Sequence, residues 1–454
     1  MNIEVKNLGV INSGSISTSG SMTILCGPNS TGKTYLSYLL YYLFSDNSYV
    51  ELDCYKDFWA TKGAGNSVEF VYSKQILDDF LDAEATKAKS ELGLVFGLAS
   101  EDVERLFGDL EINLSLSKAD YEDNKSRKAS INAYNNKFIF KIILNDEPGK
   151  IRIEKLDSNP IPESEEYKIW NFMICQSIRR AAYLPGYKPW MLIVERNSIY
   201  SFRNELINYS GFEDFGFAGD DLVRVVEFGP RRYPLAIRRS LKYANDLENI
   251  KLQQSPYYTF AVELEERLLH GNIESNQNGE IEFVIDNENR VRRLPIHLTS
   301  SIVKTMASLI LHLKYSAGPN DIIIIDEPEI NLHPDNQIIL ARIFGELVNK
   351  GLRLVISTHS DYIVRELNNM MMAYELNALD NMSYREFGLT DNMLLNKEDV
   401  NVYYFDVNNR QIVVNPAEID RYGFRVDSID NAIISQNDAT DTLHDILKYD
   451  YPIR

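Results

Sequence analysis

An eight-residue loop, Gly27–Thr34, restricts the possible folds of this chain more than any other feature. Its sequence, G-P-N-S-T-G-K-T, matches G-x-x-x-x-G-K-[ST] at every fixed position. The glycines let the backbone curl, so that its N–H groups surround phosphates at the start of a helix. The apolar run Met22–Cys26 indicates a strand before the loop, and Tyr35–Phe44 indicates a buried helix after it. This order of strand, loop and helix is the context that a phosphate-binding loop needs.

The residue types of the loop suit the binding of a nucleoside triphosphate with magnesium. Lys33 adds a positive charge beside the β- and γ-phosphates, and the hydroxyl of Thr34 is suited to bind Mg²⁺. The residues expected to bind the nucleotide are Gly27, Pro28, Asn29, Ser30, Thr31, Gly32, Lys33 and Thr34.

A second polar cluster follows a fully apolar strand. Residues Ile322–Ile325 are all isoleucine, as is typical of a strand buried on both faces of a parallel sheet. Asp326 and Glu327 follow at its carboxyl end, where open α/β sheets bind ligands. We expect Asp326 to hold Mg²⁺ through water and Glu327 to orient and deprotonate an attacking water. Two surface acids after a strand are the weaker interpretation beside an intact loop.

A third apolar run, Leu354–Ile356, leads into Ser357-Thr358-His359-Ser360. A lone histidine is more often structural, but this position after another core strand favours contact between His359 and the γ-phosphate. Strand and helix patterns alternate from Asp321 to Met371, which predicts a largely parallel sheet with helices on its faces.

The charge balance bears on the choice of partner. The formal net charge is −19, from 66 acidic and 47 basic residues, and such an excess repels phosphate backbones. Ion pairs on solvated helix faces are the favoured interpretation of the basic clusters, and a contact with nucleic acid or an acidic protein is the alternative. These clusters are Arg179-Arg180, Arg231-Arg232, Arg238-Arg239 and Lys242.

Few features of the sequence indicate a cellular compartment. Cys26, Cys54 and Cys175 lie far apart, so neither a disulfide scaffold nor a zinc site is expected. No apolar run is long enough to cross a bilayer, and Met1–Gly9 lacks the features of a secretory signal. The sequence predicts a cytoplasmic protein without membrane contact.

The run Asp326–Pro334, D-E-P-E-I-N-L-H-P, followed by Ser357–Ser360, resembles the ABC-type ATPases of the OLD/RecF/SMC group. The resemblance implies a Mg-ATPase in which Gly27–Thr34 is Walker A and Asp326-Glu327 is Walker B. It implies that Glu327 and His359 are catalytic, with His359 as the switch histidine, and that Thr34 and Asp326 hold the metal. It also places the D-loop at about Asn331–Pro334.

The signature motif of this group has its nearest match at Leu298–Lys304, L-T-S-S-I-V-K, which contains no glycine. Ser300 and Ser301 offer hydroxyls and amide N–H groups to a phosphate at the start of a helix. A simple N-cap is the alternative role for Ser300. If the signature acts on ATP held by another chain, the protein forms at least a dimer of heads.

The sequence therefore predicts an α/β fold: an ABC-type P-loop ATPase head with a mixed α/β and helical insertion lobe between Walker A and the signature. We assign the first part of the head to residues 1–50, the lobe to 51–290, the second part of the head to 291–372, and a small α/β extension to 373–454. The lobe lacks sustained heptads, so a long coiled-coil arm is not expected.

The extension 373–454 is too short for the Toprim nuclease domain of OLD proteins, and its aspartates form no D-x-D pair. A free-standing ATPase of this kind resembles the ATPase subunits of bacterial anti-phage systems of the PARIS and Septu types. The segment Glu195–Ser198, E-R-N-S, resembles a short element of the same group. That resemblance implies a separately encoded toxic effector and a phage-derived trigger.

A RecF/SMC-like DNA repair or recombination ATPase is the alternative, supported by the arginines of 231–239 and opposed by the acidic balance. A transporter subunit is a weaker candidate because the signature lacks its glycines. The pattern leaves open the trigger, the effector, the oligomer size and whether DNA binds.

Overall fold

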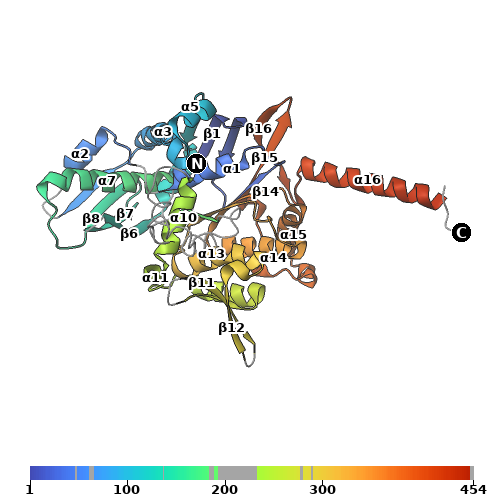
Figure 1. Ribbon diagram of the computed structural model, residues 1–454. Coiled ribbons are helices and arrows are strands. Elements are labelled where there is room, and N and C mark those ends of the chain that lie inside the picture. Colours follow the sequence, from blue (N-terminus) through green and yellow to red (C-terminus); the bar gives the residue numbers. More distant parts are fainter. Residues whose placement is uncertain are drawn as a thin grey trace, which may run out of the picture.

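A nine-stranded mixed sheet organises the molecule, with strand order β5-β1-β2-β16-β15-β3-β14-β13-β9 (Figure 1). The computed structural model describes residues 1–45, 49–60, 66–135, 138–183, 189–192, 233–276, 280–287 and 290–449. Five neighbouring strands of this sheet run parallel to one another. They are β15 (Val400–Asn408), β3 (Met22–Cys26), β14 (Arg353–Thr358), β13 (Ile322–Asp326) and β9 (Pro189–Leu192).

The parallel strands form the core as their composition predicts. Every residue of β3 and β13 is buried, as are five of the six residues of β14. Two sequence-distant segments meet here, because β14 pairs with β3 on one side and with β13 on the other. The loop that follows β3 therefore lies beside the polar residues that end β13 and β14.

The other half of the sheet is mostly antiparallel. β1 pairs antiparallel with β2 and β5, and β16 pairs antiparallel with β15 but parallel with β2. Each of the four predicted ranges, 1–50, 51–290, 291–372 and 373–454, thus contributes strands to the nine-stranded sheet. The strands of this half are β1 (Asn2–Leu8), β2 (Ile11–Ser17), β5 (Glu111–Ser115) and β16 (Gln411–Pro416).

Long helices cover the parallel strands. α1 (Lys33–Phe44) packs on β9, β13 and β14, and α14 (Pro334–Asn349) packs on β14 and on α15 (Asp361–Ala378). α13 (Ser301–Tyr315) packs against α12 (Tyr258–Leu264). None of the helices that the structure describes is both long and apolar enough to cross a membrane.

A four-stranded antiparallel sheet lies beside the main sheet, in the order β4-β8-β7-β6 (Figure 1). α7 (Glu163–Tyr183) packs on it, and the buried Trp170 of α7 meets Phe140 edge-to-face at 5.3 Å between ring centroids. Its strands are β4 (Ser67–Val71), β6 (Ala129–Asn135), β7 (Phe138–Leu144) and β8 (Lys150–Lys155). The helices of this region are α2 (Cys54–Ala60), α3 (Lys74–Ser90), α4 (Leu92–Phe96), α5 (Ser100–Phe107) and α6 (Lys118–Ser126).

A third sheet of three strands precedes α13. β11 pairs antiparallel with β12, and β10 adds a third strand. The chain turns at Asp246, which separates α10 from α11. The elements are α10 (Leu235–Asn245), α11 (Leu247–Ile250), α12, a π-helix (Glu265–Leu269), β10 (Asn272–Ser275), β11 (Ile281–Asn287), β12 (Arg290–Pro295) and a 3₁₀ turn (Ile296–Leu298).

The segment after α15 contains elements that the sequence pattern did not predict. It passes through three 3₁₀ turns (Ser383–Phe387, Asp391–Met393 and Lys397–Asp399) and then supplies β15 and β16 to the main sheet. A short hairpin, β17 (Ile419–Asp420) and β18 (Gly423–Phe424), leads into α16 (Asp427–Tyr449). α16 projects from the body of the molecule (Figure 1), and its Leu443 side chain is 62% exposed.

The first arginine cluster is internal. Arg179 is 2% exposed; its Nη2 lies 2.6 Å from Glu84 Oε1, and its Nη1 donates to the carbonyl oxygen of Ser45 at 2.8 Å. The expected ion pair is confirmed for this residue, but the expected solvated helix face is wrong, because both Arg179 and Glu84 are buried. Arg239 lies over the ring of Tyr41 at 5.7 Å. Arg231, Arg232 and Glu195–Ser198 lie outside the described residues.

Arg179→Met should destabilise the protein strongly, because it removes the guanidinium that faces the fully buried Glu84. Removing one partner of a buried ion pair costs about 3 kcal/mol or more. We expect urea unfolding to show a lower midpoint for Arg179→Met. For the half-buried Arg180→Met, the free energy of unfolding should change by less than about 1 kcal/mol. Equal midpoints for wild type and Arg179→Met would contradict this assignment.

Candidate functional site

The loop after β3 has a backbone that its glycines make possible. Gly32 has φ +95°, and a Cβ atom there would lie 2.7 Å from Ile11 Cγ1. A Cβ on Gly27 would lie 2.8 Å from Cβ of Phe405 in β15. Ser30, at the exposed tip, also has a positive φ of 62°. The close approach of β2 and β15 therefore requires glycine at both fixed positions of the loop.

Lys33 begins α1 and lies inside this loop. Its side chain is 3% exposed, and Nζ donates to the carbonyl oxygens of Gly27 at 3.1 Å and Pro28 at 2.9 Å. Thr31 Oγ1 donates to the same Pro28 oxygen at 2.8 Å. Nζ also lies 3.6 Å from Glu327 Oε1. A buried ammonium thus joins the loop to the end of β13.

Asp326 ends β13 beside Ser357, its register partner in β14. The Ser357 hydroxyl donates to Asp326 Oδ1. Burial raises the pKa of the Asp326 carboxyl, and hydrogen bonds from Ser357 and Thr34 act in the opposite direction. Thr34 and Asp326, the two residues expected to bind the metal, therefore lie close together although 292 positions separate them.

Glu327 has a left-handed backbone, with φ 49°. Its N–H is held by the Ser357 carbonyl oxygen at 3.1 Å, which maintains a conformation that non-glycine residues seldom adopt. Its carboxylate faces both Lys33 and His359, with 3.7 Å between Oε1 and His359 Nδ1. The nearby imidazole of His359, and then the charge of Lys33, hold the pKa of Glu327 below its ordinary value.

His359 follows β14 and is 36% exposed. Its Nδ1 lies 3.2 Å from Glu329 Oε1, closer than to Glu327. The pKa of His359 is raised above its ordinary value, chiefly by Glu327. Burial opposes this rise, and the charge of Glu329 adds to it. The structure thus brings together Lys33, Asp326, Glu327 and His359.

Glu329 and Ser357 also belong to the site, although the sequence pattern predicts no role for either residue. Glu329 is 7% exposed, and its Oε1 accepts hydrogen bonds from Thr358 Oγ1 at 2.9 Å and the His359 N–H at 2.7 Å. Burial raises the pKa of the Glu329 carboxyl. Both residues lie in the motifs Asp326–Pro334 and Ser357–Ser360. Their position as polar residues beside the ends of buried strands is the sequence feature that could have identified them.

The predicted D-loop is linked to the start of α15. Gln337, in the first turn of α14, donates from Nε2 to the Leu332 carbonyl oxygen at 2.9 Å and accepts a hydrogen bond from Ser360 Oγ at 2.5 Å. Ser360 Oγ also caps α15 by accepting from the Ile363 N–H. The start of α15 is therefore connected through Gln337 to the predicted D-loop, Asn331–Pro334.

The signature residues occupy the exposed start of α13. Ser300 is at the N-cap position, but its side chain makes no capping hydrogen bond. The preceding Leu298 is 67% exposed. Within the described part of the chain, no hydrogen bond or ion pair joins Ser300 or Ser301 to the loop Gly27–Thr34. The simple capping role is thus not seen, and the helix start faces outward.

Part of the chain that forms this site matches a known protein family. A family model described as an AAA ATPase domain matches residues 238–364, which include Ser300, Asp326, Glu327 and His359 but not the phosphate-binding loop. A search of curated proteins found no match.

Solved SMC head structures resemble the chain weakly. One, an SMC head bound to the C-terminal winged-helix domain of ScpA, has a TM-score of 0.35 at 11% identity, covering 92% of this chain and 98% of that chain. The SMC head of Thermotoga maritima scores 0.33 at 10% identity, with the same coverages. A Pyrococcus furiosus head with an extended coiled coil, bound to the C-terminal domain of ScpA, scores 0.31 at 11%, covering 97% and 98%.

TM-scores below 0.5 carry no inference, so the fold class follows from the strand order and the loop geometry. The fold is that of a P-loop ATPase head. The predicted fold class is confirmed, with a parallel-rich sheet and a mixed α/β lobe between the loop and α13.

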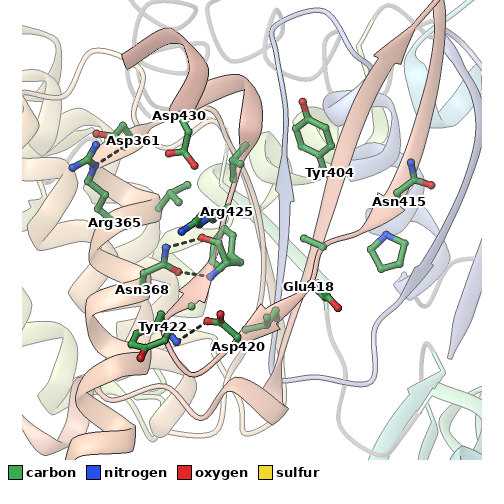
Figure 2. A pocket seen from close by; sticks show the side chains of 17 residues that line it. Asp361, Arg365, Asn368, Tyr404, Asn415, Glu418, Asp420, Tyr422, Arg425 and Asp430 are labelled. Atoms are coloured by element: carbon green, nitrogen blue, oxygen red, sulfur yellow. Dashed lines mark hydrogen bonds and ion pairs between the residues drawn. The ribbon is translucent and has the colours of Figure 1, made fainter. Parts of the chain in front are cut away.

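A separate pocket of about 870 Å³ lies between α15, the hairpin β17–β18 and the start of α16 (Figure 2). Arg365 Nε donates to Asp361 Oδ1 at 2.7 Å on its wall, and the Asn368 amide bonds both the N–H and the carbonyl oxygen of Phe424. Because α15 begins directly after Ser360, the helix that follows His359 also forms a wall of this pocket.

The pKa of His359 should fall in Glu327→Gln, because Glu327 makes the largest contribution to raising it. In the wild type, this ion pair stabilises the fold fully below the ordinary histidine pKa, and the stabilisation is lost as pH rises through the raised pKa. NMR titration of the ring protons would measure the shift, with the exposed Glu386→Gln as a matched control. An unchanged His359 titration would show that Glu327 does not stabilise the imidazolium.

Proposed function

We propose that this chain binds Mg-ATP at Gly27–Thr34 and hydrolyses it. One observation carries the proposal: Lys33, inside a loop that only glycines permit, faces Glu327 at 3.6 Å, with Asp326 beside it at the same sheet edge. A loop of backbone N–H groups, a buried ammonium and two acidic groups suit a triphosphate with a divalent cation. The AAA ATPase match to 238–364 supports the same class of activity.

The metal would be held by Thr34 and Asp326. A hydroxyl and a carboxylate are the oxygen donors that Mg²⁺ prefers, and the hydrogen bond from Ser357 orients the carboxylate of Asp326. Bound Mg²⁺ would supply charge neutralisation of the phosphates. In the free loop, the carbonyl oxygens of Gly27 and Pro28 hold Lys33 Nζ in place. Phosphate oxygens would replace them when ATP binds.

Glu327 would orient the attacking water and accept its proton. Its lowered pKa keeps it ionised at neutral pH, which suits acceptance of a hydrogen bond from water. His359 would contact the γ-phosphate, because Nδ1 faces two carboxylates and leaves Nε2 as the other ring nitrogen for a ligand.

A complete site requires a second copy of the chain in this proposal. The signature residues Ser300 and Ser301 lie at an outward-facing helix start, and the hydroxyl of Ser300 does not cap its own helix. The N-terminus of α13 is suited to the γ-phosphate of ATP held by a partner chain. Closure of two heads on ATP, followed by hydrolysis and opening, would couple the nucleotide to the oligomer.

The finer role we propose is that of a cytoplasmic sensor and scaffold subunit in an anti-phage defence system, controlling a separately encoded toxic effector in response to a phage-derived trigger. The motif run Asp326–Pro334 supports this role. A RecF/SMC-like DNA ATPase is the second candidate. Arg179 is buried and paired with Glu84, so this residue is not presented to nucleic acid.

Two substitutions separate binding from hydrolysis. Lys33→Ala should weaken ATP binding by about thirtyfold or more, since losing one member of a buried charge pair costs about 2 kcal/mol or more. Glu327→Gln should keep ATP bound while kcat falls on the order of 10²- to 10⁴-fold. Calorimetry and phosphate release would measure these effects, with Lys6→Ala and Glu386→Gln as surface controls. Equal hydrolysis by wild type and Glu327→Gln would rule out the role of Glu327.

The mass of the purified chain by light scattering would test the assembly. We expect ATP to stabilise a dimer or larger oligomer in Glu327→Gln, and Ser300→Arg to abolish this effect by filling the helix start. Ser383→Arg, at another exposed helix start, is the matched control. Capture of the protein encoded by a neighbouring gene would support the scaffold role. Dimerisation only with ATP and DNA, at physiological salt, would favour the DNA ATPase.

A further inference from the structure

Glu329 is a buried acid that none of the proposed steps uses. It lies in the turn that follows β13, three positions after Asp326, and is 7% exposed. Ionised side chains are seldom buried unless hydrogen bonds or opposite charges compensate for the loss of water. Among the described residues, the compensating groups that other residues supply belong to Thr358 and His359.

One oxygen of Glu329 contacts three groups on two consecutive residues. Oε1 accepts hydrogen bonds from the hydroxyl of Thr358 at 2.9 Å and the N–H of His359 at 2.7 Å, and it lies 3.2 Å from His359 Nδ1. The carboxylate is therefore hydrogen-bonded to the main chain of His359 and lies at ion-pair distance from Nδ1 of its ring. With Nδ1 beside this carboxylate, Nε2 remains for another partner.

Glu327 cannot perform this task throughout a catalytic cycle. Its Oε1 lies farther from His359 Nδ1, at 3.7 Å, and it also faces Lys33 at 3.6 Å. A side chain that orients water must turn toward that water, whereas Glu329 is held by the Thr358 hydroxyl and the His359 N–H. Glu329 is thus the constant partner of the imidazole.

We propose that Glu329 is a positioning residue, which holds the imidazole of His359 in the orientation that it needs to contact the γ-phosphate. This inference rests on the proposed role of His359 in ATP hydrolysis. Glu329 would act through His359 and not on the nucleotide. The feature of Glu329 that matters is then the reach of an acceptor oxygen, since the N–H and hydroxyl donors require an acceptor in that place.

Two conservative substitutions separate reach from charge. Glu329→Gln keeps an acceptor oxygen at the same reach, so kcat should stay within about threefold of wild type. Glu329→Asp keeps the charge but is one methylene shorter, so kcat should fall on the order of 10- to 100-fold, as expected for a misplaced catalytic group. KM for ATP should change less than about threefold in both, because the groups of Gly27–Thr34 are untouched.

A double-mutant cycle identifies the route of the effect. In a His359→Ala background, Glu329→Asp should cause no further loss of kcat, because the group that it positions is gone. Glu386→Gln, on the surface, is the control for a carboxylate change elsewhere. Thermal unfolding would confirm that each variant is folded. If Glu329→Asp does not fold, Glu329→Met, which fills the space without an acceptor, carries the same expectation.

The outcomes distinguish this inference from the function on which it rests. If His359→Ala hydrolyses ATP at the wild-type rate, the proposed role of His359 fails, and the role of Glu329 fails with it. If His359→Ala is slow but the losses multiply in the double variant, only the role of Glu329 is overturned. A loss of kcat in Glu329→Gln equal to that in Glu329→Asp would also overturn it, since charge would then outweigh reach.

Discussion

The parallel pairing of β14 with both β3 and β13 is the constraint on which the candidate site depends. Parallel strands present their carboxyl ends at one edge of the sheet, so the polar residues after three strands meet there. Glu327, after β13, lies 3.6 Å from Lys33, after β3, and 3.7 Å from His359, after β14. A shift of either pairing by one residue would separate them, because successive strand side chains point to opposite faces.

Electrostatics at this edge differ from those of the whole chain. The protein carries a formal net charge of −19, yet the buried ammonium of Lys33 and the raised pKa of His359 concentrate positive charge beside two carboxylates. An anionic ligand in the loop would replace some of these internal contacts. The local arrangement, and not the overall charge, therefore decides whether a triphosphate is attracted to this site.

The helices after the strand ends extend the site into the rest of the fold. α15 starts after His359 and Ser360, packs on α14, and forms a wall of the pocket beside α16. The contact of Ser360 with Gln337 connects this start to the turn before α14. The helices α14 and α15 therefore connect the residues beside His359 with the surface next to α16.

The sequence by itself determined the local elements of this protein. The loop Gly27–Thr34, the buried strands, and the acids and histidine after them follow from patterns within about ten residues, where glycine freedom and apolar periodicity decide the backbone. Only the tertiary structure decided that β15 lies beneath Gly27, that Arg179 pairs with Glu84, and that Glu329 holds His359. Those contacts join residues far apart in the chain, and they depend on strand order and register, which short-range patterns do not encode.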